Sequence, residues 1–362
     1  MTESRHAILH VISGLGTGGA ETMLVRLAGA LRDRGFEQHV VSVGGRDAKA
    51  AEIEALGIGV SALGLRTAVQ VPGCAMRLRS IAMRFRPTIL QGWMYHGDLF
   101  ATLAHGMTTG RARRRLFWNI RASNTDHAGY GRILRLSALL SARADVILAN
   151  SKAGLDFHLA KGYRPKRACV IPNGIDMARY RPDGAVRAAF RREFGIAPDA
   201  VVTIHVARLD PMKDHRTFLD AMALCPALSG IIVGLGTDTL QVPPNVKALG
   251  VRADVHQLYA AADIVVSTSV FAEGFSNVLA EGMSSGLIPI TTAIGDARLI
   301  IGDVGVEIPP RDPASLAREL NSLAALPAQQ LRHRGLAART RIEQNFTLDR
   351  VADHFATLYS ER

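Results

Sequence analysis

The sequence predicts an α/β protein built from two Rossmann-like, doubly wound parallel sheets. Its 362 residues exceed what one ordinary hydrophobic core accommodates, so two domains are expected. Short β-branched segments alternate with amphipathic segments, and this alternation runs through both halves of the chain. The composition, 48% apolar and 21% charged, is typical of a folded globular protein.

The first helix is the clearest element of the first half. Leu24, Leu27, Ala28 and Leu31 follow helical spacing, and Gly35 stands where a helix C-terminus is expected. The strands predicted in this half cover residues 7–12, 38–43, 88–93, 115–120, 145–150 and 168–172.

The second half repeats the pattern and then predicts a helix that opens at Asp312 and Pro313, an N-cap followed by a first-turn proline. Turn residues are concentrated at 171–184, which we take as the domain boundary. We therefore expect an N-terminal domain over 1–175 and a C-terminal domain over 176–345, with ligands in the cleft beyond the carboxyl ends of the strands. The predicted strands cover residues 201–207, 230–236, 246–250, 263–269, 287–292 and 304–309.

Positive charge is concentrated in the first half. Residues 1–167 carry 24 Lys/Arg and 11 Asp/Glu, a net +13, whereas residues 168–362 carry 19 and 21, a net −2. Nucleic acid, anionic lipid or a phosphorylated substrate could each explain the surplus, and so could a solvated arginine-rich surface. The arginines are clustered in two segments, Arg77, Arg79, Arg84 and Arg86, and Arg111, Arg113, Arg114 and Arg115.

The chain carries three cysteines, Cys74, Cys169 and Cys225, without metal-ligand spacing, which fits a reducing compartment. No apolar run approaches the roughly 18 residues of a membrane span, and the N-terminus has no signal-peptide layout. These features predict a cytoplasmic protein.

A glycine-rich segment, GLGTGGAE at residues 14–21, follows the first predicted strand and opens the first helix. The amides of Gly18 and Gly19 could approach an anion at the helix N-terminus, although a tight strand-to-helix turn explains the glycines equally well.

Two cations, Arg208 and Lys213, follow a strand of the second half in the segment ARLDPMK. Their position at the carboxyl end of a strand suits a diphosphate, whose charge they could stabilise as it leaves. The alternative is a surface ion pair with Asp210 or Asp214, worth only about 0–1 kcal/mol.

Two glutamates flank a predicted helix N-terminus in the segment FAEGFSNVLAEG. Glu273 precedes the helix, Glu281 lies inside it, and Ser276 can supply the N-cap, with Val278, Leu279 and Met283 on the buried side. The carboxylates can accept hydrogen bonds from hydroxyls, while the helix end attracts phosphate, and a sugar nucleotide supplies both. The phosphate would contact the main chain of Gly274, Phe275, Ser276 and Asn277.

The order ARLDPMK, then EGFSNVLAE, resembles the Arg…Lys and E-x7-E signatures of the retaining glycosyltransferase family 4. GTGGAE, IPNGID and SSGLIPITTAIGD also look like that family, so the likeness covers nearly the whole chain. The resemblance implies a GT-B fold, with two Rossmann-like domains facing a cleft and a C-terminal helix, 346–362, that crosses back to the first domain.

The resemblance also implies roles for individual residues. Arg208 and Lys213 would bind the donor diphosphate, Glu273 the hydroxyls of the transferred sugar, and Glu281 the ribose, with Arg208, Lys213 and Glu273 catalytic. Gly18 and Gly19 would belong to the donor site as well. Members of the family usually need no metal, and the chain contains no Asp-x-Asp motif, so no metal and no cofactor are expected.

The chain departs from the family where many members have a histidine after the fifth strand. The segment LFWNIRAS offers Asn119 and Arg121 instead, so the role of that histidine is not carried over. The segment GWMYHGDL places Trp93, His96 and Asp98 after the fourth strand. We expect Trp93, His96 and Arg121 on the acceptor side, although a single histidine is more often structural and Asp98 could cap a helix.

Together with the family resemblance, these observations predict transfer of a hexosyl group from a nucleoside diphosphate sugar to a hydroxyl of a glycan or lipid-linked acceptor. The resemblance implies that this transfer is retaining and metal-independent. Cell-surface polysaccharide or glycolipid synthesis on an anionic membrane surface would fit the basic first half. The sequence shows no residue pair that must act as nucleophile and base, which favours same-face attack. A nucleotide-sugar epimerase lacks a convincing acid/base pair here, and a nucleic-acid-binding protein lacks an aromatic-basic platform.

Overall fold

The computed structural model describes residues 6–107, 114–121 and 131–361. Two compact units are formed, one by the residues up to Gly174 together with those from Leu348 onward, and the other by Ile175–Thr347. Among the described helices, none combines the length and the apolar character that a membrane crossing requires.

The N-terminal unit is built on a parallel sheet with the strand order β3-β2-β1-β4-β5-β6-β7. The order reverses direction between β1 and β4, and that reversal creates the crevice in which doubly wound sheets bind ligands. The strands are β1 (Ala7–Ile12), β2 (Glu37–Ser42), β3 (Gly59–Ala62), β4 (Ile89–Trp93), β5 (Arg115–Ile120), β6 (Val146–Ala149) and β7 (Ala168–Val170).

Helices cover both faces of this sheet, because successive strand residues point to opposite faces and apolar side chains stand on both. One face packs against α1 (Gly19–Asp33), α2 (Ala48–Ala55) and α14 (Leu348–Ser360). The other packs against α3 (Val71–Phe85), α4 (Met94–Met107), α5 (Gly131–Leu140) and α6 (Lys152–Ala160).

The C-terminal unit repeats the plan with the strand order β10-β9-β8-β11-β12-β13, so its reversal lies between β8 and β11. The strands are β8 (Val202–Val206), β9 (Ser229–Val233), β10 (Val246–Ala248), β11 (Ile264–Ser267), β12 (Ile288–Thr292) and β13 (Val306–Ile308). One face packs against α7 (Gly184–Glu193), α9 (Val255–Ala261), α10 (Asn277–Ser284), α11 (Ala297–Ile301) and α13 (Ala328–Asn345). The other packs against α8 (His215–Ala223) and α12 (Pro313–Ala324).

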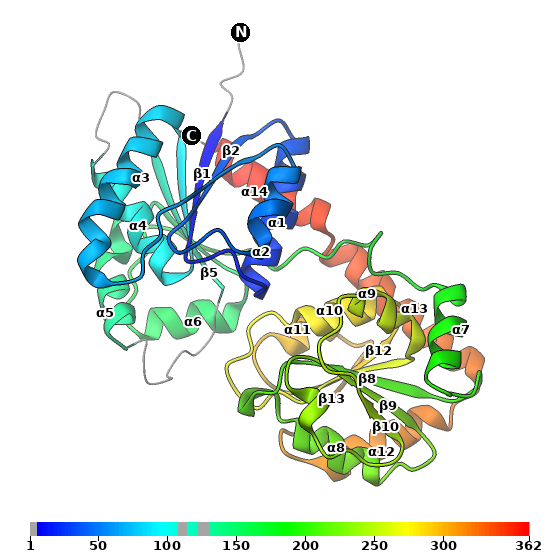
Figure 1. Ribbon diagram of the computed structural model, residues 1–362. Coiled ribbons are helices and arrows are strands. Elements are labelled where there is room, and N and C mark those ends of the chain that lie inside the picture. Colours follow the sequence, from blue (N-terminus) through cyan, green and yellow to red (C-terminus); the bar gives the residue numbers. More distant parts are fainter. Residues whose placement is uncertain (1–5, 108–113, 122–130, 362) are drawn as a thin grey trace. The chain divides into compact units, whose positions relative to one another are not determined.

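The last helix of the chain, α14, returns to the N-terminal unit, where Figure 1 shows it in red beside α1 and β2. Tyr359 is fully buried there and packs edge-on against Phe117 of β5. At the surface, Arg34 Nε donates to Asp353 at 2.8 Å. The predicted fold class, two doubly wound sheets with a C-terminal helix that belongs to the first, is confirmed.

Candidate active site

The segment after β8 places Lys213 at the carboxyl edge of the C-terminal sheet. Asp210 caps a single 3-10 turn, η3 (Pro211–Lys213), by accepting the N–H of Met212 at 2.9 Å. Asp214 then adopts a left-handed backbone conformation (φ 42°) and caps α8. These two consecutive caps reverse the chain sharply, and Lys213 lies between them.

Lys213 meets Glu273 beside the reversal point of the sheet. The Nζ of Lys213 lies 2.5 Å from Oε2 of Glu273, and the hydroxyl of Ser269 donates to the same oxygen at 2.7 Å. Only 18% of the lysine side chain and 13% of the glutamate side chain are exposed. A cation and a carboxylate from loops after β8 and β11, 60 residues apart in sequence, therefore form one partly buried cluster.

Arg208 is oriented differently from Lys213. Its Nε and one terminal nitrogen donate to Oδ2 of Asp210 at 3.1 and 2.7 Å, and 61% of its side chain is exposed. This is the surface ion pair that the sequence offered as the alternative. The guanidinium still belongs to the same loop as Lys213, so a diphosphate bound at that loop would compete with Asp210 for it.

The helix that follows, α10, starts where the sequence predicts but is capped differently. Ser276 occupies the N-cap position, yet its side chain makes no capping hydrogen bond. Leu279 and Met283 are fully buried as expected, whereas Val278 is only partly buried. Glu281 is half-buried in the middle of the helix.

The loop that carries Glu273 and Gly274 is fixed by a neighbouring turn. The N–H of Asp296 donates to the carbonyl of Gly274 at 3.2 Å. Gly295 lies so close that a Cβ atom there would stand 2.0 Å from the carbonyl oxygen of Glu273. On the other side, Phe275 packs edge-on against Phe346 at 5.5 Å between ring centroids.

Beneath Lys213, a buried hydroxyl ties the β8 and β11 loops together. Thr268 donates to the main-chain carbonyl of Lys213 at 2.8 Å and lies 3.0 Å from that of Asp214. His205 Nε2 lies 3.0 Å from the same hydroxyl and must donate to it, because the hydroxyl proton is already engaged. Burial, with the nearby His215 and Lys213, holds the pKa of His205 well below its usual value, so the ring stays neutral.

We expect Thr268→Val to lower kcat about tenfold or more while the apparent KM for the donor changes less. The isosteric substitution removes the hydrogen bonds that orient Lys213, and misplacing a reacting group by about 1 Å can cost up to ~10²-fold. Steady-state kinetics measure the split, and Thr268→Ser, which keeps the hydroxyl, is the matched control that should restore turnover. Equal turnover in the Val and Ser variants would contradict the positioning role.

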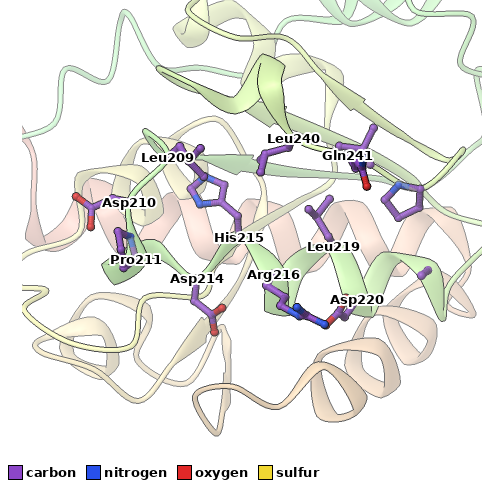
Figure 2. Close-up of a pocket in the computed structure, with 13 residues that line it drawn as sticks. Leu209, Asp210, Pro211, Asp214, His215, Arg216, Leu219, Asp220, Leu240 and Gln241 are labelled. Carbon is purple, nitrogen blue, oxygen red and sulfur yellow. The ribbon is translucent and has the colours of Figure 1, made fainter.

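Figure 2 shows a separate pocket of about 670 Å³ on the α8 side of the same loop. Three of its lining residues are acidic: Asp210, Asp214 and Asp220. Arg216 lies one turn before Asp220 on the same face of α8, with its Nε 3.2 Å from the carboxylate. Neither Lys213 nor Glu273 lines this pocket. Its acidic lining does not suit a diphosphate, because like charges repel.

In the N-terminal unit, α1 begins at Gly19 with Gly18 as its N-cap. Both glycines are exposed. The carboxylate of Glu21 folds back toward Gly18 and already supplies negative charge at this helix end. A contact of these two amides with a donor phosphate therefore remains a proposal.

Trp93 was expected on the acceptor side, but it lies in the interior of the N-terminal unit. Its side chain is fully buried, and its indole N–H donates to Nδ1 of His10 at 3.1 Å. The ring therefore acts inside the unit, as a support for Arg121, whose guanidinium carbon stands 4.9 Å from the ring centroid.

Arg121 follows β5 and is held by two amide oxygens. Its Nε donates to Oδ1 of Asn119 at 3.0 Å, and a terminal nitrogen contacts Oδ1 of Asn173. Burial lowers the pKa of Arg121 to about 9. In the part of the chain that the structure describes, no carboxylate pairs with this guanidinium. Its other terminal nitrogen is buried and has no hydrogen-bond partner among the described residues.

His96 lies on the first turn of α4 and is exposed, as an acceptor contact requires. Asp98, two positions on, is buried and accepts the main-chain N–H of Asn119 at 3.1 Å. Asp98 therefore neither caps a helix nor faces solvent; burial raises its pKa well above the usual value, against the effect of that hydrogen bond.

Sequence reasoning did not single out Thr268 and Ser269, which support Lys213 and Glu273. The available signal was their position: they are the first residues after a buried strand at the carboxyl edge, where polar side chains tend to meet ligands. The partner of Thr268, Lys213, lies 55 residues away in sequence, whereas Ser269 contacts Glu273 only 4 residues further on.

Two family models match the chain, one over each sheet. The model described as Glycosyltransferase Family 4 matches residues 17–179, and that described as Glycosyl transferases group 1 matches residues 200–325. The chain belongs to glycosyltransferase family 4. The predicted family resemblance and the enzyme class, glycosyltransferase, are thereby confirmed.

Individual relatives agree with this assignment. A D-inositol 3-phosphate glycosyltransferase of Streptomyces bingchenggensis is 30% identical over 247 residues, 60% of this chain and 53% of that protein. Another, from Streptomyces coelicolor, is 27% identical over 308 residues, 74% of this chain and 66% of that protein. The part of this family-4 chain that aligns with the D-inositol 3-phosphate glycosyltransferases of Geodermatophilus obscurus and Streptomyces bingchenggensis covers about half the length of each.

Solved structures show the same architecture. The crystal structure of Anabaena Alr3699/HepE in complex with UDP-glucose superposes with a TM-score of 0.85 at 25% identity, covering 98% of this chain and 99% of that one. This family-4 glycosyltransferase therefore has the GT-B fold.

Proposed function

We propose that this family-4 glycosyltransferase moves a hexosyl group from a nucleoside diphosphate sugar to a hydroxyl of a glycan or lipid-linked acceptor. The anomeric configuration would be retained and no metal ion would be needed. A UDP-sugar is the donor we favour, because the similar Anabaena protein is solved with UDP-glucose.

The observation that carries the proposal is the cluster of Lys213, Glu273 and Ser269 at the reversal point of the C-terminal sheet. Lys213 would stabilise the diphosphate as its charge develops, together with Arg208 and the main-chain amides of residues 274–277. Glu273 would hold hydroxyls of the sugar. Because Glu273 is already engaged by a lysine and a hydroxyl, we assign it to substrate positioning rather than to nucleophilic attack.

Same-face attack follows from this assignment. The departing phosphate oxygen would take the proton of the acceptor hydroxyl as the C–O bond to the sugar forms. No protein nucleophile would be required, and the anomeric configuration would be kept.

A donor panel tests the proposal. We expect at least one nucleoside diphosphate sugar to raise the Tm of the full chain, and release of its nucleoside diphosphate to require a membrane lipid or glycan extract as acceptor. Turnover should be unchanged by EDTA, and NMR of the product should show the anomeric configuration of the donor. A chain that no sugar nucleotide stabilises would not fit the proposal.

We further propose that the N-terminal unit docks on an anionic membrane surface through α3. Met76 and Met83, seven residues apart, are 54% and 46% exposed on this helix. Arg77 and Arg84 follow them with the same spacing and line a hollow of about 460 Å³. Exposed apolar side chains beside arginines suit an anionic interface. Arg111 and Arg113 of the second basic cluster lie outside the described residues.

Flotation with vesicles measures this docking. The full chain should float with phosphatidylglycerol vesicles at moderate salt and remain behind with neutral phosphatidylcholine vesicles. The double variant Met76→Ser/Met83→Ser should reduce flotation severalfold. Leu299→Ser, an equally exposed apolar residue of the C-terminal unit at 57%, is the matched control and should have no effect. Equal partitioning between the two vesicle types would remove the proposal.

A further inference from the structure

The N-terminal unit contains a pocket of about 640 Å³ at the reversal point of its own sheet. Its walls come from the residues just after β1, β2 and β3 and from α4 and α5. This is the edge where doubly wound sheets bind ligands, and the volume is in the range of small-molecule sites. It is distinct from the Lys213 cluster, which belongs to the C-terminal unit.

The interior of the pocket is apolar. The side chains that form most of the wall are Leu65, Val71, Leu99, Phe100, Leu103 and Ile133. Leu103 and Leu136, which also line it, keep 40% and 47% of their surface exposed. Monomeric proteins seldom leave large aliphatic side chains open around a hollow without a ligand or partner for them.

The rim carries positive charge and one free hydroxyl. Arg66 and Arg132 are exposed at the pocket, and neither has a carboxylate partner within residues 6–107, 114–121 and 131–361. None of the described residues that line the pocket is acidic. The Oγ of Ser13 is buried at the end of β1 and has no hydrogen-bond partner among the described residues. His96, expected on the acceptor side, also lines the pocket.

We propose that this pocket binds the apolar chain of a long-chain phosphate acceptor, whose phosphate is held by Arg66 and Arg132. The inference rests on the proposed transferase function and narrows its acceptor from a glycan or lipid-linked molecule to an amphiphilic phosphate. Guanidinium groups bind phosphate oxygens in pairs, and the aliphatic walls exclude water from the chain.

A free glycan fits these walls poorly. Sugars need many hydrogen-bonding partners, and apart from the two arginines and His96 the lining offers chiefly the hydroxyls of Ser13 and Thr67. A neutral lipid would leave both arginines without an anionic partner. Aliphatic walls with a cationic rim that has no carboxylate partner among the described residues therefore select a ligand with an apolar chain and an anionic group.

Calorimetric titration of the full chain tests this assignment with three probes used below their micelle concentrations. Decyl phosphate should bind at least tenfold more tightly than decyl glucoside, and inorganic phosphate should show no measurable binding. Shortening the alkyl phosphate by two methylenes should weaken binding about tenfold. Equal binding of the phosphate and the glucoside, or binding of neither, would overturn the proposal.

Variants locate the binding. Arg66→Ser combined with Arg132→Ser should weaken decyl phosphate about tenfold, and Leu136→Glu, at an exposed position, should weaken it similarly. Arg143→Ser is the matched control. Arg143 is an exposed arginine just after α5, the helix whose first turn contains Arg132, and its variant should bind decyl phosphate as the unmodified chain does. A double variant with unchanged affinity would contradict the site.

Donor binding is measured in parallel, so that a failure of the acceptor-pocket proposal can be distinguished from a failure of the proposed transferase function. The Tm shift with UDP-glucose reports on the C-terminal unit and should be the same in all these variants. If UDP-glucose raises the Tm normally but decyl phosphate does not bind, the proposed acceptor pocket alone is contradicted. Decyl phosphate binding without a shift by any sugar nucleotide would instead remove the proposed function.

Discussion

Lys213→Ala should lower turnover by about two to three orders of magnitude, the cost of removing one preorganised group that stabilises developing charge. Lys213 is the cation that the structure fixes most firmly at the proposed donor site. It is only 18% exposed, it contacts Glu273 at 2.5 Å, and its main chain is tied to Thr268. A group held in advance stabilises the leaving diphosphate without reorganisation, so kcat should fall more than KM rises.

The same substitution leaves Glu273 without its cation, and some loss of stability is expected because that carboxylate is only 13% exposed. Tm and UDP binding must therefore be measured beside kcat to separate catalysis from folding. Arg216→Ala is the matched control: this cation is 87% exposed, pairs with Asp220 within α8, and should leave turnover unchanged. Near-normal transfer by both Lys213→Ala and Arg208→Ala would refute the assignment.

The fold was predictable because its signals are local. Apolar runs of four to six residues mark each central strand, and the pattern was read correctly for the buried strands on both sides of each reversal point. Strand β3 (Gly59–Ala62) was missed, since it has only four residues and begins with a glycine. An edge strand of this length carries too little apolar periodicity to be distinguished from a loop.

The candidate site was predictable only in part, and the reason is burial. Lys213 and Glu273 were named because of the segments around them, and the structure shows them in contact. The same reasoning expected Trp93 on the acceptor side, whereas its side chain is fully buried, and it did not single out Thr268. Whether an aromatic ring faces solvent or lies beneath an arginine depends on neighbours such as His10, 83 residues away. The residues around Arg208 likewise left open whether its guanidinium would pair with Asp210 or stay free for a phosphate.

Gly295→Ala should destabilise the chain by about 2 kcal/mol or more and lower turnover at least tenfold, although this glycine bears no functional group. Gly295 adopts φ 62°, which an L-residue tolerates poorly, and its added Cβ would stand 2.0 Å from the carbonyl oxygen of Glu273. One of the two loops must move. The loop of Glu273 would then lose its position relative to Lys213.

Gly195→Ala separates the two effects of Gly295→Ala, the strain of a positive φ and the clash with the carbonyl of Glu273. Gly195 has nearly the same backbone angle, φ 63°, but nothing lies within 4 Å of the Cβ that alanine would add. It should therefore show only the conformational cost, about 1 kcal/mol, with turnover unchanged. Denaturant unfolding and kcat measured on both variants isolate the contribution of the close contact. If Gly295→Ala behaves like Gly195→Ala in both measurements, the turn at Gly295 does not hold the Glu273 loop, and the preorganisation on which the Lys213 prediction depends must come from Thr268 and Ser269 alone.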